Sequence, residues 1–196
     1  MSFNLFSTKV SVSFLFLATL SLMLLCDKTG YASLMLFAAI IHEMGHFFAM
    51  WLCKSKPTEI KLIIGSVQIC APPARMKHEA FILAFGPMAN LVTFFVAVLI
   101  CGISGNKTFP LFALINLLYF CFNALPFLGL DGGSIMLIFI SDKLGFSKAQ
   151  RIMNILTVFA ALLIFLIFAV AAIRGTVNYS VCILACYLIL SVFLKF

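Results

Sequence analysis

The sequence predicts an all-α polytopic membrane protein with about six transmembrane helices, a broken fourth span and a short cytoplasmic β-hairpin. Two observations support this fold class. Of the 196 residues, 64% are hydrophobic and only 10% are charged, and the mean hydropathy is +1.21. The apolar residues also form several runs long enough to cross a bilayer, which takes about 20 residues per helix. A water-soluble domain of this size does not have this composition.

The apolar runs predict the individual spans of a single transmembrane domain, residues 1–196. The runs cover residues 10–26, 31–53, 80–101, 108–141, 151–173 and 177–195. The first run has no convincing small-residue cleavage site and further spans follow it, so we interpret it as a retained helix. The fourth run is too long for one straight helix and contains Pro126, Gly129, Gly132 and Gly133. We therefore expect a break near its middle, which at membrane depth must be buried in protein or line a polar cavity.

The basic residues predict the orientation of these spans. Ten of the 13 Lys and Arg fall on one side and three on the other. The larger group consists of Lys9, Lys54, Lys56, Lys61, Arg75, Lys77, Lys143, Lys148, Arg151 and Lys195, and the smaller group of Lys28, Lys107 and Arg174. Because Lys and Arg accumulate in cytoplasmic loops, we expect a multi-pass protein of the cell membrane with both termini in the cytoplasm. Membrane topology also explains the net charge of +7, so no nucleic-acid partner is expected.

The strongest chemical signal is the segment His42-Glu43-Met44-Gly45-His46 inside the second span. Ionisable side chains at membrane depth are costly, and by default they mark a functional site. Two histidines four residues apart share one helix face and can bind the same zinc ion, while the glutamate between them is placed to act as a general base. The alternative is a polar cluster whose hydrogen bonds are satisfied within the helix bundle.

A catalytic zinc ion needs three protein ligands, and Asp131 is the best candidate for the third. His42 lies 11 residues before the expected end of its span at Cys53, and Asp131 lies 10 residues before Ser141. Both spans run inward, so both residues are expected about 15 Å below the cytoplasmic surface at 1.5 Å per residue. We predict one Zn²⁺ per chain, bound by His42, His46 and Asp131.

Two alternatives concern this third ligand. Asp131 could instead cap the helix segment that begins there. His78, which lies beside Lys77 and Glu79 in a basic loop, is a rival ligand, although a solvated loop histidine is the ordinary interpretation.

Three segments of the chain resemble motifs of the site-2 protease family of intramembrane zinc metallopeptidases, peptidase family M50. His42–His46 is similar to the family's zinc motif, Gly86–Asn90 to its Gly-Pro-x-x-Asn segment, and Asn123–Gly133 to its Asn-x-x-Pro…Asp-Gly motif. The resemblance covers about residues 30–150. Six spans with a cytoplasmic-side site are most similar to the stage IV sporulation factor B branch, although the sequence to Phe196 contains neither that branch's CBS domain nor a PDZ domain.

The resemblance implies an endopeptidase that cleaves a transmembrane or membrane-tethered protein near the cytoplasmic face. A sigma-factor precursor or an anti-sigma factor would be a typical substrate, and regulatory membrane proteins would be further partners. Zinc lowers the pKa of its bound water, Glu43 would accept the proton, and hydroxide would attack the substrate carbonyl. Asn90 and Asn123 are candidate donors to the resulting oxyanion. For each, the alternative is an interhelical hydrogen bond that stabilises the bundle.

Residues 59–70 predict a β-hairpin, because they are rich in β-branched side chains and contain a turn signal at Gly65-Ser66. A helical substrate must unwind before its peptide bonds can be attacked, and an exposed strand edge could hold it extended. We expect Ile63 and Ile64 to offer such an edge for strand addition. The alternative is a hairpin that packs on the membrane surface.

Two other functions compete with a site-2-type protease. One is a non-catalytic zinc-binding membrane protein, either a transporter or a pseudoprotease, which would not need Glu43 as a base. The other is a membrane zincin of the CAAX-processing or HtpX-like type, which uses a downstream glutamate as its third ligand. No intramembrane glutamate follows His46, which argues against this second type.

Overall fold

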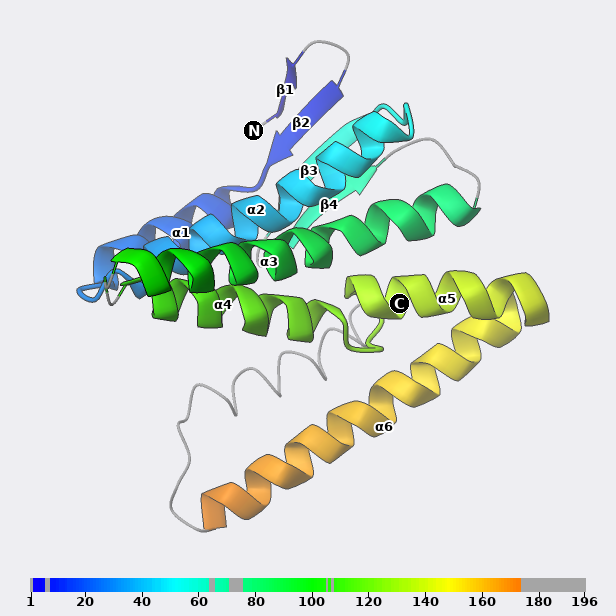
Figure 1. Cartoon of the computed structure of the whole chain (residues 1–196). Coiled ribbons are helices and arrows are strands. Elements are labelled where there is room, and N and C mark those ends of the chain that lie inside the picture. Colours follow the sequence, from blue (N-terminus) through cyan, green and yellow to red (C-terminus); the bar gives the residue numbers. More distant parts are fainter. Residues whose placement is uncertain are drawn as a thin grey trace. The chain divides into compact units, whose positions relative to one another are not determined.

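The computed structural model describes residues 2–5, 8–63, 66–70, 76–104, 106 and 108–173 (Figure 1). The predicted span over residues 177–195 lies outside these residues. The chain divides into two compact units, Met1–Phe122 and Asn123–Phe196.

The first unit contains four apolar helices: α1 (Phe14–Cys26), α2 (Tyr31–Leu52), α3 (Met76–Ser104) and α4 (Thr108–Asn123), whose last residue opens the second unit. By length and composition, α2 and α3 are long and apolar enough to cross a membrane, while α1 and α4 are shorter apolar helices. Among the described elements, α2 packs most extensively on α3. The full set of six spans stays a prediction.

A four-stranded sheet joins the start of the chain to the segment between α2 and α3. Its strands are β1 (Ser2–Leu5), β2 (Thr8–Val12), β3 (Glu59–Ile63) and β4 (Ser66–Cys70), in the order β1-β2-β3-β4. The predicted hairpin is confirmed as the antiparallel pair β3–β4. The strands β1 and β2 were not predicted. The first helix therefore begins at Phe14 and not at residue 10, because the β-branched residues of Thr8–Val12 pair in parallel with β3.

The sheet order corrects the expected site of strand addition. Strand β3 lies between β2 and β4, so both of its sides are occupied over Glu59–Leu62. Ile63 ends this inner strand and pairs with Ser66, while Ile64 lies outside the described residues. Among the described strands, the edges of the sheet are β1 and β4, and a substrate strand would have to add there.

The turn before α2 is built around Asp27. Its carboxylate accepts hydrogen bonds from the backbone N–H of Thr29 (2.9 Å), the hydroxyl of Thr29 (2.6 Å) and the backbone N–H of Ala32 (2.7 Å). These bonds, led by the one from the Thr29 hydroxyl, lower the pKa of Asp27 to about 2. Gly30 takes the left-handed conformation that this turn requires, with φ of 78°. The polar turn thus satisfies N–H groups at the start of the helix that carries the histidines.

The second unit contains α5 (Asp131–Leu144) and α6 (Phe146–Ile173), which pack against each other. The predicted break in the run 108–141 is present, since α4 ends at Asn123 and α5 begins at Asp131. Gly129, with φ of 100°, allows the chain to turn within this break. Helix α6 begins five residues before the predicted residue 151, directly after the turn at Gly145.

Candidate metal centre

His42 and His46 lie one turn apart on α2, and both are buried. Their Nε2 atoms are 3.1 Å apart, and their rings meet edge to face with centroids 4.7 Å apart. The expectation that the i, i+4 spacing brings both imidazoles together is confirmed.

The other nitrogen of each ring contacts an oxygen on α3. His46 Nδ1 lies 2.9 Å from the backbone carbonyl oxygen of Ile82, and His42 Nδ1 lies 2.9 Å from Asn90 Oδ1. A carbonyl oxygen can only accept a hydrogen bond, so Nδ1 of His46 must carry the hydrogen. The same holds for His42 if the amide of Asn90 is oriented with its oxygen toward the ring.

The neighbours of Asn90 fix that orientation. Its Nδ2 donates to the backbone carbonyl of Ala38 (3.0 Å) and to Asn116 Oδ1 (2.9 Å), and Asn116 Nδ2 donates to the carbonyl of Phe112 (2.8 Å). The two backbone carbonyls can face only the NH₂ end of each amide. Asn90 therefore turns its oxygen toward His42. The interhelical role that was the alternative for Asn90 is present, since these bonds connect α2, α3 and α4.

With hydrogen on both Nδ1 atoms, the Nε2 atoms of His42 and His46 are the ring nitrogens left to bind a metal, and they face each other 3.1 Å apart. In neutral rings both atoms carry lone pairs, and a cation bound to both would hold them together without repulsion. Two nitrogens bound to one tetrahedral zinc at about 2.05 Å would lie about 3.3 Å apart. The pair therefore has the orientation and spacing that a zinc ion needs.

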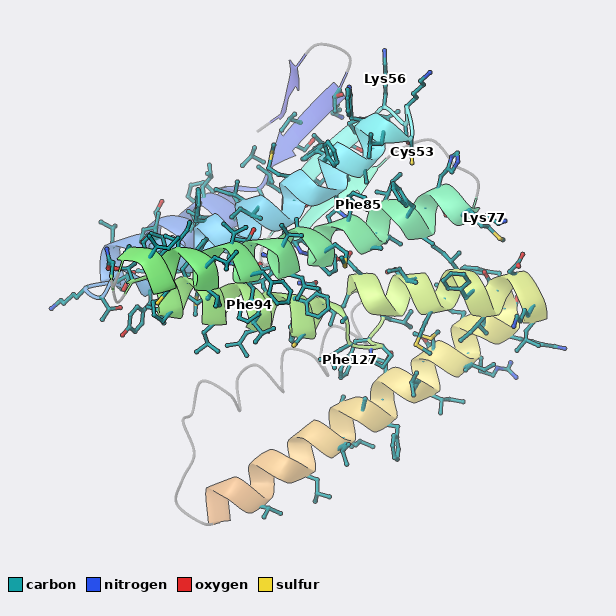
Figure 2. The ribbon with its side chains drawn as sticks, viewed as in Figure 1. Cys53, Lys56, Lys77, Phe85, Phe94 and Phe127 are labelled. Atoms are coloured by element: carbon teal, nitrogen blue, oxygen red, sulfur yellow. The ribbon has the colours of Figure 1, made fainter. Side chains whose placement is uncertain are left out.

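Glycines let α2 and α3 approach at this point. A Cβ placed on Gly86 would overlap the ring of His46 and come within 2.9 Å of His42 Cε1. A Cβ on Gly45 would overlap the carbonyl oxygen of Phe85, a residue labelled on α3 in Figure 2, and lie 2.9 Å from Ala89 Cβ. Both positions need glycine, because the histidine rings occupy the space beside Gly86 and the backbone of α3 occupies the space beside Gly45.

Tyr119 adds a further contact to the histidine pair within the first unit. The ring of Tyr119 on α4 meets that of His42 edge to face at a centroid distance of 5.6 Å. The Glu43 carboxylate interacts electrostatically with the Tyr119 phenol. The sequence interpretation missed Tyr119 and Asn116. The available signal was a polar side chain within an apolar helix, which is typical of interhelical hydrogen bonding.

Asp131 is the first residue of α5 in the second unit and is partly buried. The cap position of this helix is Leu130 and not Asp131, which weakens the capping alternative. The preceding loop folds closely onto the helix start. A Cβ on Gly132 would lie 2.5 Å from the carbonyl oxygen of Ala124, and one on Gly133 would overlap the carbonyl of Phe127. Asn123, the other motif residue here, ends α4.

His78, the rival third ligand, is exposed in the first turn of α3. It was expected in a loop, as was its neighbour Lys77, which projects from the start of α3 in Figure 2. Eight residues separate His78 from Gly86, whose backbone contacts the histidine rings, and at 1.5 Å per residue this is about 12 Å along the helix. That separation argues against His78 as a ligand.

Known proteins resemble this chain in sequence and in fold. Stage IV sporulation protein FB of Bacillus subtilis (strain 168) is 30% identical over 125 residues, which are 60% of this chain and 43% of that protein. The chain thus spans less than half the length of this curated relative. The solved structure of a site-2 protease from Methanocaldococcus jannaschii matches with a TM-score of 0.72 and 18% identity, covering 98% of this chain and 94% of that one. No family model matches the chain.

Proposed function

We propose that this chain, which belongs to the site-2 protease family, is a zinc endopeptidase that cleaves proteins within or beside the membrane. The observation that carries this proposal is the pair of Nε2 atoms, 3.1 Å apart on buried histidines, in a segment that also contains Glu43. A shared metal ion explains why the two nitrogens face each other. The glutamate between the ligands favours a hydrolytic site over one for storage or transport.

We assign the metal to His42, His46 and Asp131, the three ligands that the sequence predicts. Two imidazoles and one carboxylate are a common ligand set of zinc peptidases, and they leave a fourth position for water. The motif around Asp131 and the shared fold support the choice of the third ligand.

Zinc, when bound, would polarise the substrate carbonyl and lower the pKa of a water molecule toward neutrality. Glu43 would accept the proton of that water and then deliver it to the leaving amine. Asn123 stays our proposed donor to the oxyanion. Asn90 does not fit this role, because its NH₂ group donates to Ala38 and Asn116.

The proposed substrate is a transmembrane or membrane-tethered protein cut near the cytoplasmic face, such as a sigma-factor precursor or an anti-sigma factor. The relative named as a sporulation protein supports testing such substrates first. We propose that the unwound substrate adds to the edge strand β4, since β3 is an inner strand. The proposed location is the cell membrane, with several spans and both termini in the cytoplasm.

The test is cleavage by the purified full chain in liposomes that contain tethered sigma-factor precursors or anti-sigma factors. Glu43→Gln should bind one zinc per chain like the wild type but cleave at least about 100-fold more slowly, because a positioned general base contributes about 10²–10⁴-fold. Met44→Leu is the matched control, since Met44 is exposed on the same turn, and it should cleave normally.

Two results would count against the proposal. Full activity of Glu43→Gln would remove Glu43 from the role of base. Zinc binding by the wild type with zinc uptake into the liposomes and no cleavage of any tethered protein would favour a transporter.

A further inference from the structure

We propose that Asn116 and Asn90 form an amide relay that holds His42 in the tautomer with hydrogen on Nδ1, so that its Nε2 faces the metal. The inference rests on the proposed zinc function and deepens it. It assigns positioning roles to two residues on helices other than the one that carries the histidines.

The relay has a defined direction because each end meets a helix carbonyl. Asn116 Nδ2 donates to Phe112 O on α4, and Asn90 Nδ2 donates to Ala38 O on α2. If the Asn90 amide were flipped, its oxygen would lie 3.0 Å from the Ala38 carbonyl oxygen and its NH₂ group would point at His42. The two oxygens would then repel each other, and the NH₂ group would favour the His42 tautomer without hydrogen on Nδ1. The observed orientation is therefore the stable one.

Because both amides are buried, any other orientation of them would be energetically costly. Asn90 and Asn116 are both fully buried, at 0% exposure. A buried amide that loses a partner cannot replace it with water, and the cost of leaving such a group unpaired is high. The relay therefore has one satisfied arrangement.

The rings of the two histidines are oriented by different groups of the first unit. His46 is oriented by one bond to a backbone carbonyl, that of Ile82. His42 is oriented through a side chain whose own position depends on α4. A displacement of α4 should therefore disturb His42 and leave the partner of His46 in place.

An imidazole with hydrogen on Nε2 cannot bind zinc through that atom. Loss of the acceptor at Nδ1 removes what selects the correct tautomer, and changes to such supporting partners typically cost 10–100-fold in metal affinity. The tautomer of His42 and the zinc affinity should therefore change together.

The first experiment measures zinc affinity of the purified full chain by competition with a chelator. Asn90→Leu should lower the affinity about 10–100-fold. Asn90→Asp keeps an oxygen acceptor for His42 but loses both donors to Ala38 and Asn116, and it should bind zinc at least about tenfold more tightly than Asn90→Leu. If Asn90 matters only for packing, Asn90→Asp should be no better than Asn90→Leu, and that result would overturn the relay.

Thr93→Val is the matched control on the same helix. The Thr93 hydroxyl donates within α3 to Ala89 O at 2.8 Å, and its loss should leave zinc affinity unchanged. Failure of the wild type to bind zinc would contradict the proposed function itself. Zinc binding by the wild type with equal affinities for both Asn90 variants would contradict the relay alone.

The second experiment reads the tautomer without zinc and without activity. The chain has three histidines, so ¹⁵N-histidine labelling gives three rings to follow by NMR. In the zinc-free wild type, His42 should carry its hydrogen on Nδ1. Asn116→Leu is a milder change than Asn90→Leu, because it leaves Asn90 in place. In this variant a second population of His42, with hydrogen on Nε2, should appear. An unchanged His42 spectrum in Asn116→Leu would remove Asn116 from the relay.

A double variant tests whether the effects of Asn90 and Asn116 on zinc affinity are additive. Because Asn116 acts through Asn90, the double variant Asn90→Leu/Asn116→Leu should bind zinc no more weakly than Asn90→Leu alone. Independent, additive losses would show that Asn116 acts by another route and would contradict the proposal.

Discussion

His42 and His46 lie within a long helix, whereas Asp131 is the first residue of a short one. The histidine rings are oriented by acceptors on another helix, the Asn90 amide on α3 and the Ile82 carbonyl about two turns earlier. The chain around Asp131 is shaped by close backbone packing, because the loop before it folds back against Gly132 and Gly133. Hydrogen bonds from another helix thus orient the histidine rings, whereas close backbone packing shapes the start of α5.

An anchor from α6 supports the backbone of the second region. The N–H of Leu128 donates to Thr157 Oγ1 at 3.1 Å, and the same hydroxyl donates to Met153 O at 2.8 Å. This buried hydroxyl connects the loop to α6. The hydrogen bonds described for the histidine region come from α3 and α4 together. We therefore expect substitutions in the histidine region and in the loop before α5 to act for different physical reasons.

The largest effect is expected for Gly86→Ala. Its Cβ would overlap the His46 ring, so either the ring must leave its place or α2 and α3 must separate. Zinc binding should be lost, and the free energy of unfolding should fall by about 1–3 kcal/mol, as for other overpacked cores. Zinc stoichiometry and thermal unfolding in detergent measure both effects.

Gly102→Ala is the matched control, because a Cβ at Gly102 on the same helix meets nothing within 4 Å. It should leave zinc binding unchanged. Normal zinc binding by Gly86→Ala would show that the close contact with the histidine rings is not required.

An intermediate effect is expected for Thr157→Val in the second region. The substitution keeps the shape of the buried side chain but leaves the N–H of Leu128 without its acceptor. The free energy of unfolding should fall by about 1–3 kcal/mol. Thermal unfolding measures the loss, and the His42 tautomer should stay as in the wild type.

Thr19→Val is the control for this change. The Thr19 hydroxyl donates to carbonyls of its own helix and is exposed, so its loss should hardly change the unfolding temperature. An equal loss in both variants would mean that the hydroxyl of Thr157 is not a specific anchor.

The smallest effect is expected at Asp27, which supports the far end of the histidine helix. Because folding lowers the pKa of Asp27 from 3.8 to about 2, its stabilising contribution is present above pH 3.8 and is lost as the pH falls through about 2. Asp27→Ala should therefore unfold at a lower temperature than the wild type near neutral pH, and the difference should vanish near pH 2.

Thr29→Val sharpens this prediction by removing the hydroxyl that contributes most to the lowered pKa. The loss of stability should then occur at a pH closer to 3.8. A difference between Asp27→Ala and the wild type that stayed constant with pH would contradict the role of this carboxylate.

The sequence by itself determined the features that depend on near neighbours in the chain. The facing histidines follow from a four-residue spacing on a helix, and the break before Asp131 follows from Pro126 and the glycines around it. The hairpin β3–β4 likewise depends on a short turn. These features are local, so periodicity and steric rules were sufficient. Three short motifs also carried the resemblance to the site-2 protease family.

Only the tertiary structure decided how the histidines are oriented. The partners of His42 and His46 lie 48 and 36 residues away, and Asn90 and Asn116 are 26 residues apart. Likewise, the parallel pairing of β2 with β3 moved the free sheet edge from β3 to β4. No local pattern encodes such pairings, because they depend on which helices and strands pack together. The spacing of two histidines predicted a metal site, and the packing of three helices determined which nitrogen of each ring faces it.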